Sequence, residues 1–228
     1  MKKVNELIKL PEVKTIFNLF NDNQGIYLVG GCIRDTLSGK EVTDIDFAID
    51  IDPEEVVKTL SNNNIKFYDI GINYGTVTAV IDSKNYEITS LREDIETDGR
   101  HAKVKYTSDI KADSLRRDFT INAIYANRDG ELFDFHNGID DIENRNLKFI
   151  GSANDRVKED YLRILRYFRF YADFSNFEID ANLKKVFKEG SKNFSKISKE
   201  RIWTELKKII NQNNSFKSLS MMNEANIL

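Results

Sequence analysis

The chain has 228 residues, of which 40% are apolar and 31% are charged, and it contains a single cysteine. One cysteine excludes an intrachain disulfide framework and is typical of a reducing compartment. The sequence shows no signal-peptide pattern and no apolar run long enough to span a bilayer, so we expect a soluble, cytoplasmic protein with one good core and a second, smaller one.

The net charge of −3 hides an uneven distribution along the chain. Residues 156–208 carry 14 Lys and Arg against 8 Asp and Glu, a net charge of +6, whereas residues 1–155 carry −9. An acidic, metal-binding first part followed by a basic second part suits an enzyme that acts on the end of a nucleic acid. The alternative is that the helical surfaces are simply rich in lysine.

The hydrophobic pattern predicts helices and strands in the first part of the chain and helices from Asp155 to the C-terminus. Residues 92–113 are polar and contain Asp98-Gly99, which predicts a mobile loop. The predicted helices are residues 2–20, divided at Pro11, a helix that starts near Cys32, and residues 53–60, with Asp52 as N-cap. The predicted strands are residues 27–29, 43–49, 65–70, 75–81 and 85–91.

Two glycines follow the first predicted strand, in the segment YLVGGCIRDTLSG that starts at Tyr27. Gly30 and Gly31 permit close approach of the backbone to a ligand, and the helix that follows offers free N–H groups to a phosphate. Arg34 adds a positive fork for the same anion. This order of residues is typical of a nucleoside-triphosphate site, although an ordinary tight turn also explains the glycines.

Three carboxylates are candidates for a metal site. In the segment TDIDFAI the side chains alternate, so Asp44 and Asp46 share one face of a strand, about 7 Å apart. Glu87 projects away from the core and completes a three-carboxylate cluster if its strand lies beside that of Asp46. Such oxygens suit Mg²⁺ together with substrate phosphates, which predicts a two-metal phosphoryl-transfer site with Asp44 and Asp46 as metal ligands. The alternatives are solvated loop aspartates and a solvent-facing strand glutamate.

The segment RRDFTINA, residues 116–123, places two adjacent arginines before an apolar, helix-like run. Arg116 and Arg117 at the start of a helix could clamp ribose or phosphate oxygens. A surface ion pair is the alternative for an RRD sequence alone.

A second candidate nucleotide site lies in EDYLRILRYFRF, residues 159–170. On one helix, Asp160 and Arg163 would present an acceptor beside a donor, with Arg166 and Arg169 on the same row. Cytosine and adenine both offer an amino donor beside a ring-nitrogen acceptor, whereas uracil and guanine reverse that pattern. One acid and one arginine could therefore select C and A together. The alternative is an intrahelical salt bridge worth about 0.2 to 0.5 kcal/mol.

These segments, together with YEITSLREDIETDGR and DFHNGIDDI, occur in an order that resembles the class II tRNA nucleotidyltransferase (CCA-adding) and bacterial poly(A) polymerase family, from residue 26 to about 210. The resemblance implies an α+β fold: a nucleotidyltransferase head, residues 1–150, with a small mixed β-sheet and flanking helices, then an all-α neck and partial body, residues 151–228. It also implies addition of C and A, from CTP and ATP, to the 3′ end of tRNA without a template, by two-metal in-line attack on the α-phosphate.

The resemblance assigns roles to the residues that match its motifs. Asp44 and Asp46 would hold Mg²⁺ and Glu87 would assist, as the catalytic group. The nucleotide-binding group would be Gly30, Gly31, Arg34, Arg117, Asp160, Arg163, Arg166 and Arg169, of which Asp160 and Arg163 would read the base. The polar loop around Asp98 to Asp113 resembles the element associated with addition of the final A, which argues against an enzyme that adds only CC.

The chain ends where family members usually continue into further helical regions that grip the tRNA. Its last residues, MMNEANIL, resemble the middle of the body, so we expect a truncated chain or the product of a split gene. The sequence leaves open a poly(A) polymerase or A-adding enzyme, a noncatalytic RNA-binding module, and the oligomeric state.

Overall fold

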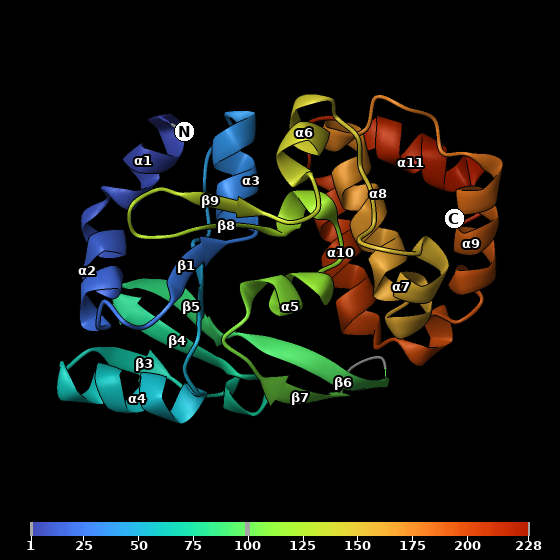
Figure 1. Ribbon diagram of the computed structural model, residues 1–228. Helices are drawn as coiled ribbons and strands as arrows, with labels where there is room; N and C mark the ends of the chain where they lie inside the picture. The colour runs from blue at the N-terminus through green and yellow to red at the C-terminus, as the bar shows by residue number, and fades with distance from the viewer. Residues whose placement is uncertain (1, 99–100, 228) are drawn as a thin grey trace. The chain divides into compact units, whose positions relative to one another are not determined.

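The structure is a computed structural model that describes residues 2–98 and 101–227 (Figure 1). The chain forms two compact units, each assembled from several segments. Unit 1 comprises Met1–Glu96, Lys103–Arg117 and Ile121–Ile139, and unit 2 comprises Thr97–Ala102, Asp118–Thr120 and Asp140–Leu228. The predicted domain boundary at residue 150 stays a prediction.

A mixed sheet forms the centre of unit 1 (Figure 1). In the described residues its strand order is β3-β4-β5-β2-β1-β8-β9, with β2 and β5 parallel and the other neighbours antiparallel. A strand lies within or close to each of the five predicted ranges, although β2 begins three residues later than predicted, and β8 and β9 are additional. The bounds are β1 Ile26–Val29, β2 Asp46–Ile49, β3 Lys66–Tyr68, β4 Thr76–Ile81, β5 Lys84–Ser90, β8 Ile124–Ala126 and β9 Leu132–Asp134.

The helices of unit 1 cover this sheet and supply apolar side chains to its core. The break predicted at Pro11 is confirmed, since Pro11 opens the second helix. The Phe17 ring meets the Phe47 ring of β2 edge-on, with 5.5 Å between centroids. The helices are α1 Lys2–Ile8, α2 Pro11–Leu19, α3 Gly31–Ser38, α4 Pro53–Asn62 and α5 Ile110–Leu115, and a short 3₁₀ turn spans Ile72–Tyr74.

The segment predicted as a mobile loop, residues 92–113, is instead regular over most of its described length. β6, Arg92–Asp98, pairs with β7, His101–Tyr106, and α5 follows. The turn between the strands, Gly99 and Arg100, lies outside the described residues. Strand pairing satisfies backbone groups whatever the side chains are, so a polar segment can form a hairpin that an apolar pattern does not reveal.

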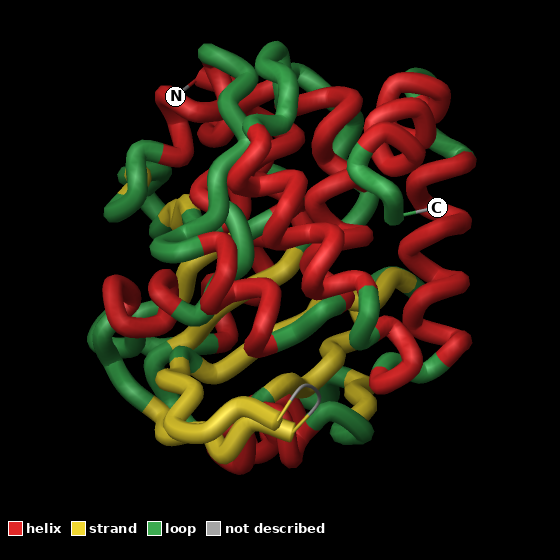
Figure 2. The backbone as a smooth tube through the Cα atoms, turned by 90° about the vertical axis from the view of Figure 1, so that its right-hand side faces the viewer, coloured by secondary structure: helices red, strands yellow, loops and turns green. Residues whose placement is uncertain are grey.

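From α6, Gly138–Glu143, onward the regular elements of the described chain are all helical, as Figures 1 and 2 show. The central helix is α8, which packs against α7, α9, α10 and α11 around a cluster of aromatic rings that includes Phe149, Tyr167 and Phe187. The helices are α7 Ala153–Glu159, α8 Leu162–Phe174, α9 Ala181–Ser191, α10 Lys199–Ile210 and α11 Ser215–Glu224. Among residues 2–98 and 101–227, no helix has the length and apolar character that crossing a membrane requires.

Candidate active site

The glycine turn between β1 and α3 brings two of the predicted arginines together. Gly30 has φ of +77°, a conformation that residues with a Cβ rarely adopt, and α3 begins at Gly31. A Cβ atom at Gly30 would lie 3.5 Å from Nη1 of Arg117, and one at Gly31 would lie 3.6 Å from Nη2 of Arg34. Each glycine of the turn therefore lies beside an arginine guanidinium group, Gly30 beside that of Arg117 and Gly31 beside that of Arg34.

Arg34 is fixed on this turn by two neighbours that the sequence pattern does not point to. Its Nε and Nη2 donate to the two carboxylate oxygens of Asp35, at 2.9 and 2.7 Å, and its Nη1 donates to Oδ1 of Asn122 at 2.7 Å. Asn122 is the last residue of a short 3₁₀ turn, Thr120–Asn122, that leads into β8. The pairing of Arg34 with both groups orients its guanidinium before any ligand arrives.

Arg116 and Arg117 follow a helix instead of opening one, so that prediction is wrong. Arg116 is the C-cap of α5, and the apolar run after it is a 3₁₀ turn and the strand β8. Pairing of β8 with β1 and β9 draws this run into the sheet, and tertiary pairing outweighs its helix-like pattern. The guanidinium groups of Arg116 and Arg117 consequently both form ion pairs with Asp113, which lies three residues before Arg116 and four before Arg117.

Strand pairing places two of the predicted carboxylates side by side. Asp46, the first residue of β2, lies opposite Glu87 of the parallel strand β5, as the sequence analysis required. Glu87 is exposed, while its neighbours Tyr86 and Ile88 are buried, which confirms that it projects away from the core. Asp44 lies before the strand, which begins at Asp46, so the prediction that the two aspartates share one strand face is wrong. Asp44 is exposed, and its carboxylate accepts a hydrogen bond from Thr43 Oγ1 at 3.1 Å.

The charges of this group act on one another. Burial, followed by the charges of Glu87 and Asp44, raises the pKa of Asp46 to about 6, against the opposing effect of Arg117. Repulsion among carboxylates is the condition that a divalent cation relieves, and hard oxygen donors fit Mg²⁺. Within the described part of the chain, no three such side chains converge closely enough to hold one ion. The three-carboxylate metal site therefore stays a prediction.

The raised pKa of Asp46 predicts a cost in stability. Because the folded pKa lies above the unfolded value, stability falls as pH rises from about 4 to 6 and stays lower above that range. In metal-free buffer at pH 7.5 we expect Asp46→Asn to raise the free energy of unfolding by roughly 1 to 3 kcal/mol. Urea unfolding with EDTA at pH 7.5 and at pH 4.5 measures this. The difference between the two proteins should be markedly smaller at pH 4.5 than at pH 7.5, and equality at pH 7.5 would contradict the raised pKa of Asp46.

In unit 2, Asp160 and Arg163 do not share a helix face as predicted. Asp160 is the C-cap of α7 with extended backbone angles, and α8 starts at Leu162. The Asp160 carboxylate accepts from the Leu162 N–H at 3.0 Å and from Arg201 Nη2 at 2.8 Å. An aspartate that accepts from a backbone N–H two residues on competes with continuation of the helix, which explains the break.

The salt bridge expected as the alternative also involves another partner. Arg163 pairs with Glu159 at 2.5 Å and donates to the backbone oxygen of Arg156 at 3.0 Å. The Arg163 guanidinium is thus held against the end of α7, the segment that leads to Asp160. Whether this pair reads a base stays a prediction.

The two further arginines of α8 are held by acidic residues far away in sequence. Arg166 pairs with Asp118 through Nε at 2.7 Å and Nη2 at 2.5 Å, and Arg169 pairs with Glu205 at 3.1 Å. Asp118 and Glu205 are 7% and 5% exposed, so both carboxylates are shielded from water. The i+3 spacing of the arginines indicates a common row, but no local pattern indicates these partners.

A cavity of about 740 Å³ also lies in unit 2. Phe149, Tyr167 and Phe177 are among the residues that line it, and none of the predicted nucleotide-binding residues is. Cavity size therefore does not point to the candidate site.

The sequence matches a profile described as the head domain of poly(A) polymerase over residues 26–148. The chain belongs to the class II tRNA nucleotidyltransferase and poly(A) polymerase family. A second profile, described as a probable RNA- and SrmB-binding site of polymerase A, matches residues 176–228. The family resemblance drawn from the motifs is thereby confirmed.

Curated relatives carry names of CCA-adding enzymes. The chain is 40% identical over 210 residues to CCA tRNA nucleotidyltransferase 1, mitochondrial, of Danio rerio, and 42% identical over 202 residues to the protein of that name in Homo sapiens. It is 38% identical over 186 residues to the CCA-adding enzyme of Streptococcus gordonii. These matches cover 81% to 90% of this chain but only 45% to 49% of the relatives. The chain spans about half the length of the curated relatives it matches.

Solved structures of CCA-adding enzymes share the fold. The Bacillus stearothermophilus enzyme in complex with CTP gives a TM-score of 0.83 at 27% identity, over 96% of this chain and 53% of that one. A CCA-adding enzyme in complex with ATP gives 0.75 at 25% identity, over 99% of this chain and 54% of that one. The predicted α+β class, with a nucleotidyltransferase head, is confirmed.

Proposed function

We propose that this chain adds C and A from CTP and ATP to the 3′ end of tRNA. The observation that carries the proposal is the arrangement in unit 1, where Asp46 lies opposite Glu87 and the Gly30-Gly31 turn gathers Arg34 and Arg117. The names of the relatives, which include CCA tRNA nucleotidyltransferase, support the choice of reaction and substrates.

The triphosphate would bind at the glycine turn. The backbone at Gly30 and Gly31 carries no side chain that would keep phosphate oxygens away, and the α3 N-terminus contributes N–H groups and its dipole. Arg34 and Arg117 supply fixed positive forks beside that surface. Catalysis by these groups is positioning and charge stabilisation, and neither arginine exchanges a proton.

Nucleotidyltransferases of this family use divalent metal ions. We propose Mg²⁺ as the ion here, held by Asp44 and Asp46 with assistance from Glu87, because the donor set consists of carboxylate oxygens. Bound Mg²⁺ supplies a lowered pKa for the attacking 3′ hydroxyl and neutralisation of the pyrophosphate leaving group.

Base selection would belong to the segment between α7 and α8. Each Asp160 oxygen accepts one protein hydrogen bond and has a lone pair left for the amino group of cytosine or adenine. Arg163, held nearby by Glu159, would donate to the ring nitrogen. Arg166 and Arg169 would support the nucleotide from the same helix.

Addition of A alone, or of a poly(A) tail, is the second candidate, and the description of the matching head-domain profile favours it. The test is incubation of the purified chain with tRNA lacking its 3′ end, Mg²⁺ and each labelled nucleotide in turn. CCA addition predicts incorporation of CTP first and of ATP onto the CC product. Use of ATP alone would favour the second candidate, and no Mg²⁺-dependent incorporation would favour a noncatalytic RNA-binding module.

We propose a cytoplasmic location, which the single cysteine supports. The names of the animal relatives place those proteins in mitochondria, so the compartment needs its own test. Fractionation of the source cell with an antibody to this chain would decide it.

A further inference from the structure

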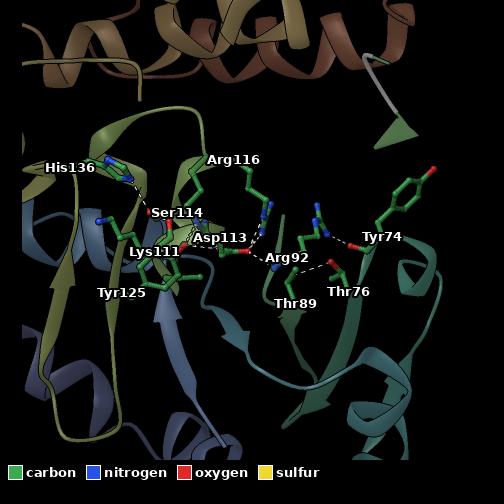
Figure 3. A network of polar contacts seen from close by, with 12 residues as sticks. Tyr74, Thr76, Thr89, Arg92, Lys111, Asp113, Ser114, Arg116, Tyr125 and His136 are labelled. Carbon is green, nitrogen blue, oxygen red and sulfur yellow. Dashed lines mark hydrogen bonds and ion pairs between the residues drawn. The ribbon is translucent and has the colours of Figure 1, made fainter. Parts of the chain in front are cut away.

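Asp113 is a buried carboxylate to which the proposed catalytic and binding roles assign nothing. It lies in α5 with no exposed surface, although it carries a charge. Figure 3 shows it between Arg116, Tyr125 and the backbone of Arg92. Burying an unpaired carboxylate costs free energy, so the partners of Asp113 are required to keep it ionised at this depth and hold it in one position.

The two oxygens of Asp113 have different partners. Oδ1 accepts from Nε of Arg116 at 2.8 Å and from the backbone N–H of Arg92, at the start of the β6–β7 hairpin, at 3.1 Å. Oδ2 accepts from the Tyr125 hydroxyl at 2.6 Å and pairs with Nη2 of Arg117 at 3.3 Å. One carboxylate thus joins the hairpin base, the end of α5 and the strand β8.

Arg117 is held at two of its three nitrogens by this group. Its Nη2 meets Asp113, and its Nε donates to the Tyr125 hydroxyl at 2.9 Å. A guanidinium is planar, so fixing Nε and Nη2 also fixes the direction of Nη1. That remaining nitrogen is the atom 3.5 Å from the position of a Cβ on Gly30.

The protonation states agree with these donor and acceptor roles. Burial raises the pKa of Asp113, but the charges of Arg116 and Arg117 outweigh it and hold the pKa below its usual range. Burial raises the pKa of Tyr125, so its hydroxyl keeps the proton that it donates to Asp113. Asp113 is therefore ionised and Tyr125 neutral at physiological pH.

We propose that Asp113 is a positioning residue for the nucleoside triphosphate: together with Tyr125 it orients Arg117 so that Nη1 faces the phosphates at the Gly30-Gly31 turn. This inference rests on the proposed function, since it assumes that the turn binds a triphosphate. It adds a residue to which the family resemblance gave no role of its own.

The test compares Asp113→Asn and Tyr125→Phe with Ser114→Ala as a matched control. Ser114 is the next residue of α5 and is equally buried, and its hydroxyl bonds His136 Nε2 at 2.8 Å (Figure 3) and donates to the Lys111 backbone oxygen at 2.6 Å. Steady-state kinetics on tRNA lacking its 3′ end give KM and kcat for CTP and ATP, and calorimetry gives the Kd of CTP. We expect Asp113→Asn to raise KM and Kd about tenfold, with kcat changed much less.

Tyr125→Phe keeps the ring packed against Val29 and Leu91 and removes only the hydroxyl. We expect a rise in KM of about threefold to tenfold for it, and a change below about twofold for Ser114→Ala. Should Asp113→Asn fail to fold by circular dichroism, Tyr125→Phe carries the test.

Unchanged KM and Kd in both variants would overturn the inference, and so would an equal rise in Ser114→Ala, which would show a structural effect only. Failure of the proposed function looks different, because the unmodified chain would then incorporate no nucleotide. In that case the Kd of CTP for the variants still decides the role of Asp113.

Discussion

Asp46→Asn is expected to lower the rate of nucleotide incorporation by at least about 10³-fold, while the same substitution stabilises the metal-free protein. The amide keeps the shape of the side chain but loses the charge that would hold a divalent ion beside the triphosphate. Because Asp46 is the most buried member of the group and lies opposite Glu87, no neighbouring carboxylate can replace it. Single-turnover incorporation of labelled CTP into tRNA lacking its 3′ end measures the loss.

The control for this variant is Asp50→Asn. Asp50 follows Ile49, the last residue of β2, and its carboxylate lies beside Gly25, at the opposite end of the strand from Asp46. Its activity should stay within about threefold of the unmodified chain, as for ordinary substitutions away from a site. Retained turnover in Asp46→Asn would remove Asp46 from the catalytic group.

Asp160→Ala is expected to relax base choice more than it slows the reaction. The ratio of kcat/KM for CTP and ATP over that for UTP and GTP should fall about 10- to 100-fold, because the wrong bases no longer face a mispaired acceptor. Since Asp160 also accepts from the Leu162 N–H and Arg201, some loss of stability should accompany this change. Competition among the four labelled nucleotides at equal concentration measures the selectivity.

Asp155→Ala is the matched control for Asp160→Ala, since Asp155 is an exposed acid on the same helix, α7. It should leave selectivity unchanged. If Asp160→Ala keeps the preference for CTP and ATP, base reading belongs to other residues.

The parts of the fold that were predictable from the sequence are those with strong local patterns. β-Branched runs and turn residues indicated β4 and β5, and Pro11 and Pro53 marked the starts of α2 and α4. The adjacency of Glu87 and Asp46 followed from treating both strands as parts of one sheet. The hairpin β6–β7 and the strand β8 could not be predicted, because their stability comes from pairing and not from an apolar pattern.

The candidate site shows the same division. The glycine turn and Arg34 were visible as a motif. The helix α3 begins at Gly31, close to the start predicted near Cys32, so its free N–H groups lie at the glycine turn. The acidic partners of Arg166 and Arg169 were not visible in the sequence, because Asp118 is 48 residues from Arg166 and Glu205 is 36 residues from Arg169. Long-range ion pairs have no signature in one sequence. Asp113 is different, since its i, i+3 and i, i+4 spacing to two arginines is a local signal.

The most direct test of the account is a crystal structure of this chain grown with Mn²⁺, as a substitute for Mg²⁺, and a non-hydrolysable analogue of CTP. We expect anomalous density for Mn²⁺ in contact with the carboxylates of Asp44 and Asp46, and phosphates against Gly30, Gly31 and the guanidinium of Arg34. Metal bound elsewhere, or the nucleotide in the cavity lined by Phe149 and Phe177 with the glycine turn bare, would contradict it.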